Sequence, residues 1–360
     1  MKTSKPNVGG QAVMEGVMMR APKSMAIAVR RESGQISLKE GVWHSIWDKL
    51  TFLRWPFFRG TVVMVEAMIN GMQALNFSAE EAMMGTEAES AGKDENPPGK
   101  FGIAMTMAIG LIFAIGLFKF LPHMAASYAG LLIRGTQLTV DDTLYHVVDG
   151  VVKLSIFIGY VAVIGLSKDI TRVFQYHGAE HMSIYTFEAG EPLVVENAKT
   201  KSRLHPRCGT AFIMVVILTF IIVAAMLMPY LPDWAKPTPE GPWYRHLILV
   251  GLKLPLLIPV AGIAYEFNRF AGKHCDSAWL RPFLWPGLAM QLLTTKQPSD
   301  DQLEVALTSL RAVLHREAVG GAVPSNDSES VVFDDFTAFE NAYPIQNQTT
   351  PIEEKQATGS

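Results

Sequence analysis

Cysteine and charged residues are both scarce in this sequence. Only Cys208 and Cys275 occur among 360 residues, too few for a disulfide framework, so the cysteine content gives no sign of an oxidising compartment. The formal net charge is -3, charged residues make up 18% of the chain, and no basic stripe is interleaved with aromatics. We therefore expect no nucleic acid as a direct ligand. The first residues lack an apolar stretch, so we also expect no cleavable signal peptide.

Hydrophobic residues, in contrast, make up 49% of the chain and gather in long runs. A membrane-spanning helix needs about 20 mostly apolar residues, and the runs that approach this length are 101–121, 150–166, 208–231 and 246–265. The last run contains Pro255 and Pro259, so we expect it to be kinked. The pattern predicts a mainly α-helical polytopic membrane protein with about four transmembrane helices.

The loops between these runs differ in charge, which predicts the orientation in the membrane. The loop between the second and third runs carries the basic residues Lys168, Arg172, Lys199, Lys201, Arg203 and Arg207. The loops on the other side carry fewer basic residues and several acidic ones. By the positive-inside rule the basic loop is cytoplasmic, and both termini lie on the same side.

Two segments outside the apolar runs alternate in the way that β-hairpins do. In "SMAIAVRRESGQISL" a strand turns at residues 32–34, and in "MSIYTFEAGEPLVVEN" a similar strand turns at residues 189–192. Each follows a Gly-containing motif, GGQAVMEG or YHGAEH. Because an isolated hairpin is marginal in water, we predict that the two hairpins pair into one sheet of a small α/β cytoplasmic domain.

The chain is then expected to divide into consecutive regions. They are a cytoplasmic Gly-rich motif and hairpin (1–40), an interfacial or re-entrant helical region (41–77), an acidic linker (78–100), a first transmembrane pair (101–166), a cytoplasmic loop with YHGAEH and the second hairpin (167–207), a second transmembrane pair (208–265), a cytoplasmic region with an amphipathic helix (266–318) and an acidic tail (319–360). The amphipathic helix is predicted from leucines at helical spacing after a capping box of Ser299 and Gln302. The tail composition predicts disorder, with docking of a protein partner as the alternative.

The motif YHGAEH, residues 176–181, brings three polar side chains into one helical turn. On a helix His177 and His181 lie one above the other, so both imidazoles could bind one metal ion, with Glu180 beside them as a base. The spelling H-x-x-E-H also occurs in one class of zinc proteases. A pattern this short arises by chance as well, so a metal site needs further ligands that converge on it.

The predicted topology supplies such ligands. His205 and Cys208 close the same loop, and Glu266 lies at the cytoplasmic end of the fourth run. Imidazole, thiolate and carboxylate all bind zinc, so we expect zinc or a similar divalent metal. The predicted site then comprises Glu180 as the catalytic base and His177, His181, His205, Cys208 and Glu266 as metal ligands. The alternative is that these residues only flank the membrane at its headgroups, with Glu266 paired to Arg269.

Six blocks occur in order along the chain from Val8 to about Leu310. They are "VGGQAVMEGVMMRAPKSMAIAVRR", "RGTVVMVEAMINGMQALNFSA", "VFQYHGAEHMSIYTFEAGE", "SRLHPRCGTAF", "AGIAYEF" and "LTTKQPSDDQLEVAL". Together they resemble the signature blocks of the YqhQ-like family (DUF 1385), bacterial multi-pass membrane proteins of unknown function that have been labelled predicted metal-dependent enzymes. The family usually has a Lys where this chain has Met182.

The resemblance implies a place in the bacterial cytoplasmic (inner) membrane, with the lipid bilayer as a partner. It also implies that the metal-enzyme label falls on His177, Glu180, His181, His205 and Cys208. The function expected from residues and resemblance together is a metal-dependent hydrolase at the cytoplasmic face. The alternative is a non-enzymatic membrane scaffold or assembly factor, with a structural metal site or none.

Overall fold

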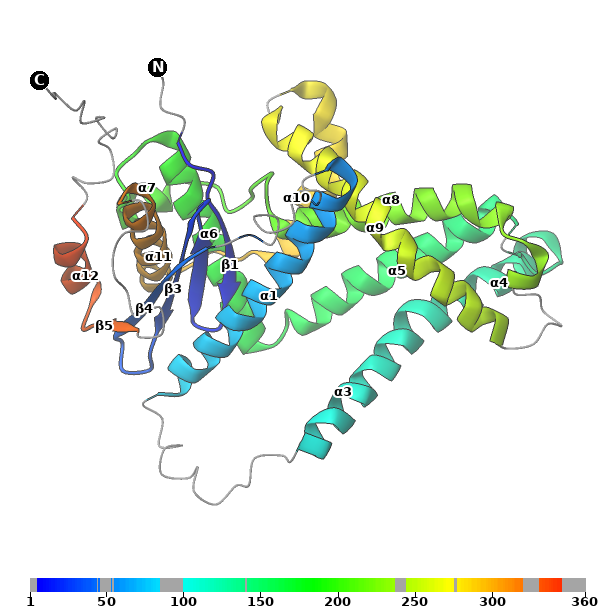
Figure 1. The fold of residues 1–360 in the computed structure, drawn as a ribbon, viewed down its shortest axis with the longest axis horizontal. Helices are drawn as coiled ribbons and strands as arrows, with labels where there is room; N and C mark the ends of the chain where they lie inside the picture. Colours follow the sequence, from blue (N-terminus) through cyan, green and yellow to red (C-terminus); the bar gives the residue numbers. More distant parts are fainter. Residues whose placement is uncertain are drawn as a thin grey trace, which may run out of the picture.

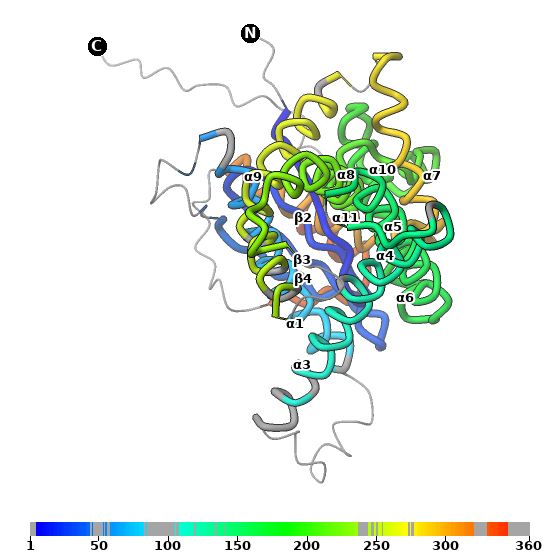
Figure 2. The backbone as a smooth tube through the Cα atoms, turned by 90° about the vertical axis from the view of Figure 1, so that its right-hand side faces the viewer, coloured from blue at the N-terminus to red at the C-terminus, as the bar shows by residue number. Residues whose placement is uncertain are grey.

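The computed structural model describes residues 5–43, 45, 53, 55–84, 100–139, 141–236, 244–274, 277–319 and 330–344. An antiparallel sheet with its covering helices lies at one end of the molecule, and long apolar helices extend from it toward the other end (Figure 1). Viewed along its length, the sheet lies behind the apolar helices (Figure 2). The chain therefore has a small α/β part and a mostly helical part.

The sheet is formed mainly by the first 42 residues. Within the described residues it has five strands in the order β1-β2-β3-β4-β5, each antiparallel to its neighbours. The strands are β1 (Gly9–Val13), β2 (Gly16–Arg20), β3 (Ser24–Arg30), β4 (Ile36–Val42) and β5 (Val331–Phe333). The hairpin predicted in "SMAIAVRRESGQISL" is confirmed as β3 and β4. The GGQAVMEG motif supplies β1 and the turn of a further hairpin with β2, and this turn holds Glu15 at a φ of 50°.

Side chains alternate between the two faces of the sheet, and each face is covered by helices. Val17 and Met19 point to the face covered by α6 (Lys168–Ala189) and α11 (Asp300–Ala318). Met18, between them, packs on the other face against α1 (Pro56–Met83). The alternation is the period-2 pattern of a strand buried on both faces. The α/β part thus consists of a sheet between two helical layers.

Helix α11 is built as its sequence predicts. The side chain of Ser299 accepts from the backbone of Gln302, whose own side chain accepts from the Ser299 backbone N–H, so the capping box is confirmed. The leucines of the predicted stripe are all buried in the core under the sheet: Leu303, Leu307, Leu310 and Leu314. Local capping and apolar spacing point to the same helix here, which is why the sequence sufficed.

The prediction of a second hairpin in "MSIYTFEAGEPLVVEN" is wrong. Residues 182–189 continue α6, and a short helix, α7 (Val195–Lys199), follows. Gly190, read from the sequence as a hairpin turn, ends α6 with a φ of 75°, and Pro192 stands two residues later. This combination of glycine and proline is typical of helix C-termini. The alternating pattern was interpreted as a strand because residues 178–184 are all buried. This stretch of α6 therefore has no solvent-facing polar side from which the 3.6-residue helical period could be recognised.

The acidic tail is ordered in part, so the prediction of disorder for 319–360 is wrong for residues 331–343. Strand β5 pairs with β4, and α12 (Phe336–Ala342) follows it. Phe339 is completely buried, and Glu340 forms an ion pair with the buried Arg311 of α11. Aromatic residues placed among the acidic ones supply the apolar contacts that the overall composition hides. Residues 345–360 lie outside the described part of the chain.

The helical part contains α3 (Lys100–Ile115), a π-helical turn (Gly116–Phe120), α4 (Leu121–Arg134), α5 (Thr143–Ile164), α8 (Gly209–Leu227), α9 (Tyr244–Lys273) and α10 (Arg281–Thr294). Short 3-10 turns occur at Met228–Tyr230, Asp233–Ala235 and Ala278–Leu280. Among the described residues, three helical stretches are long and apolar enough to cross a membrane: Ala108–Ile133, Thr143–Ile164 and Gly209–Tyr230. They support membrane association. The predicted fourth span lies within α9, which is not one of the three, so that span and the orientation stay predictions.

The region predicted as interfacial contains one long helix, α1. The helix runs from residue 56 to residue 83, so it takes up the first residues assigned to the acidic linker. Residues 85–99 of that linker lie outside the described residues. The first half of α1 packs closely against α9, where a Cβ on Gly60 would lie 2.5 Å from the carbonyl oxygen of Ala261. The second half covers the sheet (Figure 1), so α1 connects the two parts of the molecule.

Candidate metal centre

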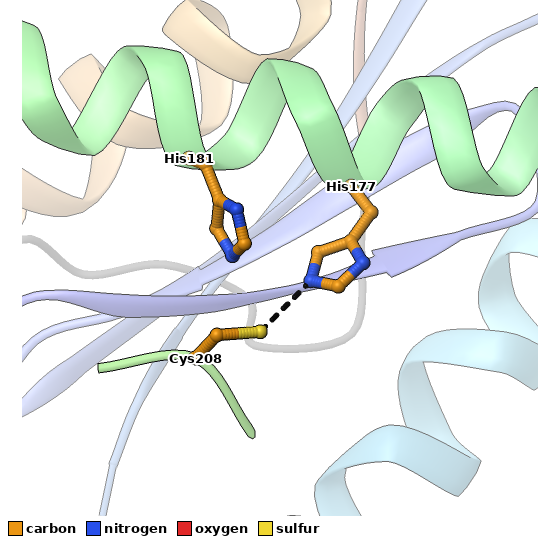
Figure 3. Close-up of side chains that lie close together, drawn as sticks. All are labelled: His177, His181 and Cys208. Carbon is orange, nitrogen blue, oxygen red and sulfur yellow. Dashed lines mark hydrogen bonds between the residues drawn. The ribbon is translucent and has the colours of Figure 1, made fainter. Parts of the chain in front are cut away.

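Helix α6 and the start of α8 bring together three side chains that can bind a metal. His177 and His181 lie one turn apart on α6, and Cys208 is the N-cap residue of α8 (Figure 3). One nitrogen of each imidazole and the Cys208 sulfur all lie within 4.8 Å of one another. His177 Nε2 lies at hydrogen-bond distance, 3.1 Å, from the Cys208 Sγ.

Backbone carbonyls orient both imidazoles. His177 Nδ1 lies 2.9 Å from the carbonyl oxygen of Thr294, and His181 Nδ1 lies 2.5 Å from that of Arg203. A carbonyl only accepts, so each Nδ1 carries the proton and each Nε2 keeps its lone pair. The Nε2 of His181 is buried and has no hydrogen-bond partner among the described residues. Two basic nitrogens are thus held toward one thiol, an arrangement that protein metal sites use.

The Thr294 carbonyl belongs to α10, a segment outside the site predicted from the sequence, whereas Arg203 lies in the same loop as His205. Gln291 of α10 exchanges two hydrogen bonds with the backbone of His205, of 2.7 Å and 2.8 Å, and so holds the loop before α8. The backbone N–H of Lys296 donates to the carbonyl of Phe174. A Cβ on Gly178 would lie 2.2 Å from the Lys296 carbonyl oxygen, so only glycine permits this approach. The block "LTTKQPSDDQLEVAL" contains Thr294 and Lys296 and was the available signal.

Glu180 lies beside the two imidazoles and is buried. Its Oε2 is 3.9 Å from the Nε2 of His177 and 3.9 Å from that of His181. Burial raises the pKa of Glu180 to about 7, while the electrostatic interaction with His177 and a hydrogen bond from the backbone of Gly10 act to lower it. A Cβ on Gly10 would lie 2.7 Å from the Glu180 Cγ, so strand β1 reaches the carboxylate only because residue 10 is glycine.

Comparison with known proteins assigns the family. Residues 55–316 match the family described as "Protein of unknown function (DUF1385)". The chain is also 33% identical over 320 residues to the "Uncharacterized protein YqhQ" of Bacillus subtilis (strain 168), covering 87% of this chain and 94% of that protein. The chain belongs to the DUF1385 family. No solved structure matches it. The family match includes His177, Glu180, His181 and Cys208.

His205, predicted as a ligand, lies next to this group but faces other partners. Its Nδ1 accepts from the backbone N–H of Arg207 at 3.3 Å, and its Nε2 lies 3.5 Å from Glu188. Burial lowers the pKa of His205, against the opposing effect of Glu188. Both of its nitrogens are therefore engaged, and its ring lies beside that of His181 in a tilted arrangement, with 5.6 Å between centroids. In this DUF1385 chain the cysteine, and not His205, joins the two histidines of α6.

Glu266, the remaining predicted ligand, is engaged elsewhere in the structure. Its carboxylate forms a two-pronged ion pair with Arg59 of α1. Under the alternative interpretation the sequence predicts Arg269 as its partner, but the partner in the structure comes from the other side of the α1–α9 contact. A bidentate Arg–carboxylate pair between two packed helices stabilises their docking, so Glu266 has a structural role in this arrangement.

The GGQAVMEG motif is the second glycine-rich feature, and it contacts the same helix. Glu15, at the tip of the β1–β2 hairpin, forms a bidentate ion pair with Arg172 of α6, and the Tyr176 hydroxyl lies 3.4 Å from the same carboxylate. Glu15 holds the tip of the hairpin while Gly10 contacts Glu180. The motif therefore seats β1 along α6 over the turn that carries the histidines.

Proposed function

We propose that this DUF1385 protein binds one zinc-like divalent ion through His177, His181 and Cys208. The observation that carries the proposal is the pair of hydrogen bonds from the two Nδ1 atoms to backbone carbonyls, which leaves both Nε2 atoms facing the thiol. Zinc ligands at about 2.0 to 2.3 Å from the ion lie roughly 3.5 Å apart. Donor atoms within 4.8 Å of one another need only a small rotation to reach that spacing.

The reaction class that best suits this set is hydrolysis. Three protein ligands leave a fourth position open, as catalytic zinc sites do. When bound, such an ion would polarise a carbonyl or phosphoryl oxygen and make water more acidic. Glu180 is within reach to accept a proton at Oε2, and the Gly10 N–H fixes its orientation. Burial of the site excludes bulk water from these groups.

A structural metal site in a non-enzymatic membrane scaffold is the second candidate. Burial favours it: His181 is 1% exposed and Cys208 is 6% exposed. A closed site of this kind would tie α6 to the start of α8 and so fix the α/β part against the apolar helices. The two candidates differ in what they require of Glu180, because a scaffold needs the carboxylate only for packing.

Metal content tests the proposed ligand set. Purified wild-type protein is expected to carry about one zinc-like ion per chain. His177→Ala, His181→Ala and Cys208→Ser are each expected to lose it, whereas His205→Ala keeps it because the His205 ring faces Glu188. His274→Ala removes an exposed histidine and is the control. Elemental analysis of detergent-purified protein gives the number of metal ions per chain. If the wild-type protein contains no metal even after incubation with zinc, the proposed metal site is wrong.

Replacement of Glu180 separates the enzyme from the scaffold. In Glu180→Gln the amide oxygen still accepts from Gly10, so the fold and the bound ion should survive, but the side chain no longer takes a proton. We expect this variant to lose function by about a hundredfold or more in complementation of a strain that lacks the gene, as loss of a general base does. Glu196→Gln, at an exposed position of α7, is the matched control. Full function of Glu180→Gln favours the scaffold.

A further inference from the structure

A cavity of about 480 Å³ lies on the other side of β1 from Glu180. It is lined by strands β1 and β2, the inner face of α1 and the C-terminal half of α9, and its wall includes Gly10, Arg20, Val63, Asn70 and Tyr265. Small-molecule sites have volumes of roughly 300 to 1,000 Å³. The cavity is therefore large enough for part of a ligand, and it is separate from the candidate metal centre.

The polar groups of the wall include a buried hydrogen-bond donor in need of an acceptor. Asn70 is 2% exposed, and its amide nitrogen has no hydrogen-bond partner among the residues that the structure describes. The Arg20 guanidinium lies over the Trp43 ring at 4.1 Å and pairs with the buried Glu66 at 3.5 Å, and this ion pair uses only part of its five N–H donors. A buried donor without a partner is costly. An amide and a guanidinium facing one space suit an oxygen-rich anionic group such as a phosphate.

Apolar residues form much of the remaining wall, together with Asn7 and Gln11, and the outer face of α1 exposes apolar side chains. Val8, Met18 and Val63 line it beside the donors. On the opposite face of α1, Met68 and Met72 are 65% and 61% exposed. An exposed apolar helix face is the kind of surface that an interfacial helix lays into the boundary of a membrane. A ligand with both an anionic group and hydrocarbon chains fits this setting better than a small soluble anion.

We propose that this cavity binds the phosphate group of a phospholipid or related lipid phosphate that enters beside α1 from the membrane surface. Asn70 and Arg20 donate to the phosphate oxygens, and the apolar wall contacts the start of the hydrocarbon chains. The inference goes beyond the proposed metal site, because its donors belong to β2 and α1 and none of them is a proposed metal ligand.

Binding of short-chain lipids to the full chain tests the proposal. The probes are dihexanoyl phosphatidylglycerol, dihexanoylglycerol, which lacks the phosphate, and inorganic phosphate, each titrated into protein in neutral detergent and followed by native mass spectrometry. We expect the phosphatidylglycerol to bind and the other two to bind at least about tenfold more weakly, the size of effect that one charge-assisted hydrogen bond supports. Equal binding of dihexanoylglycerol overturns the phosphate contact, and equal binding of inorganic phosphate overturns the lipid.

Two variants with matched controls assign the binding to this cavity. Asn70→Leu removes the unpartnered amide at similar volume, so it should keep the fold and weaken phosphatidylglycerol binding about tenfold. Ala67→Trp places a bulky ring at an exposed position of the cavity wall and should also block binding. Asn76→Leu and Gln73→Trp make the same changes at exposed positions of α1 outside the cavity. If all four variants bind like the wild type, the lipid binds elsewhere. His181→Ala should bind it normally whether or not the metal site exists.

Discussion

Chelation of metal is expected to lower the unfolding temperature of the wild-type protein by roughly 10 °C and to leave that of His181→Ala unchanged. An ion that binds only the folded state contributes about 4 kcal/mol when its free concentration is a thousand times its dissociation constant. One kcal/mol corresponds to about 2 to 4 °C for a domain of this size. Removal of the ion also leaves the buried His181 Nε2 without a partner, which adds to the loss.

The comparison between variants identifies the cause of the shift. His274→Ala, the exposed control, should respond to the chelator as the wild type does, and Cys208→Ser should resemble His181→Ala. Differential scanning fluorimetry on detergent-solubilised protein, with and without a membrane-impermeant chelator, provides the measurement. If neither the chelator nor added zinc changes the unfolding temperature of the wild type, the three side chains hold no ion.

Phe339→Ala is expected to lower the free energy of unfolding of the α/β part by about 3 kcal/mol, within the usual range for a buried phenylalanine. Phe339 is completely buried, stacks on Tyr343 with 4.8 Å between ring centroids, and faces the Arg311 guanidinium at 5.3 Å. Loss of the ring also loosens α12, and with it the Glu340 carboxylate that pairs with the buried Arg311. The decrease in the free energy of unfolding cannot exceed the free energy with which residues 331–343 dock onto the rest of the α/β part. Once these residues have detached, losing more of their contacts has no further effect on stability.

Phe336→Ala is the matched control for this prediction. Phe336 belongs to the same helix but is only partly buried, so its removal should cost clearly less. Urea unfolding monitored by tryptophan fluorescence gives the free energies, and limited proteolysis shows whether the tail separates from the sheet. Equal and negligible effects of both substitutions would mean that residues 331–343 do not pack on α11 in solution.

Local signals in the sequence were sufficient where one helix face or one turn decides the structure. The capping box at Ser299 and the leucines of α11 act within a few residues, and the structure has both. The turn at Gly34 separates two alternating strands, and they form a hairpin. His177 and His181 face the same way because a helix returns to the same side after four residues. In each case the contacts that determine the structure join residues that are close together in the sequence.

Burial from several directions removed the local signal in α6. Its residues 178–184 contact the sheet, α11 or the loop before α8, so polarity does not mark a solvent face, and alternation was mistaken for a strand. The tail shows the same limit. Its acidic composition predicts disorder, yet β5 pairs with the edge of β4, and four aromatic side chains pack against the core that contains α11: Phe333, Phe336, Phe339 and Tyr343. That edge and that core exist only in the folded protein.

The sequence by itself determined the family, the apolar helices and the two histidines of the candidate site, since each depends on residue order or on spacing within a helix. Tertiary structure decided that Cys208 rather than His205 joins the histidines, and that Glu266 pairs with Arg59 instead. It also supplied the carbonyls of Arg203 and Thr294, which orient the rings. Every residue has the same backbone carbonyl, so the sequence does not show which carbonyls orient the rings. The direction of a side chain depends on what packs around it, which the sequence alone does not show either.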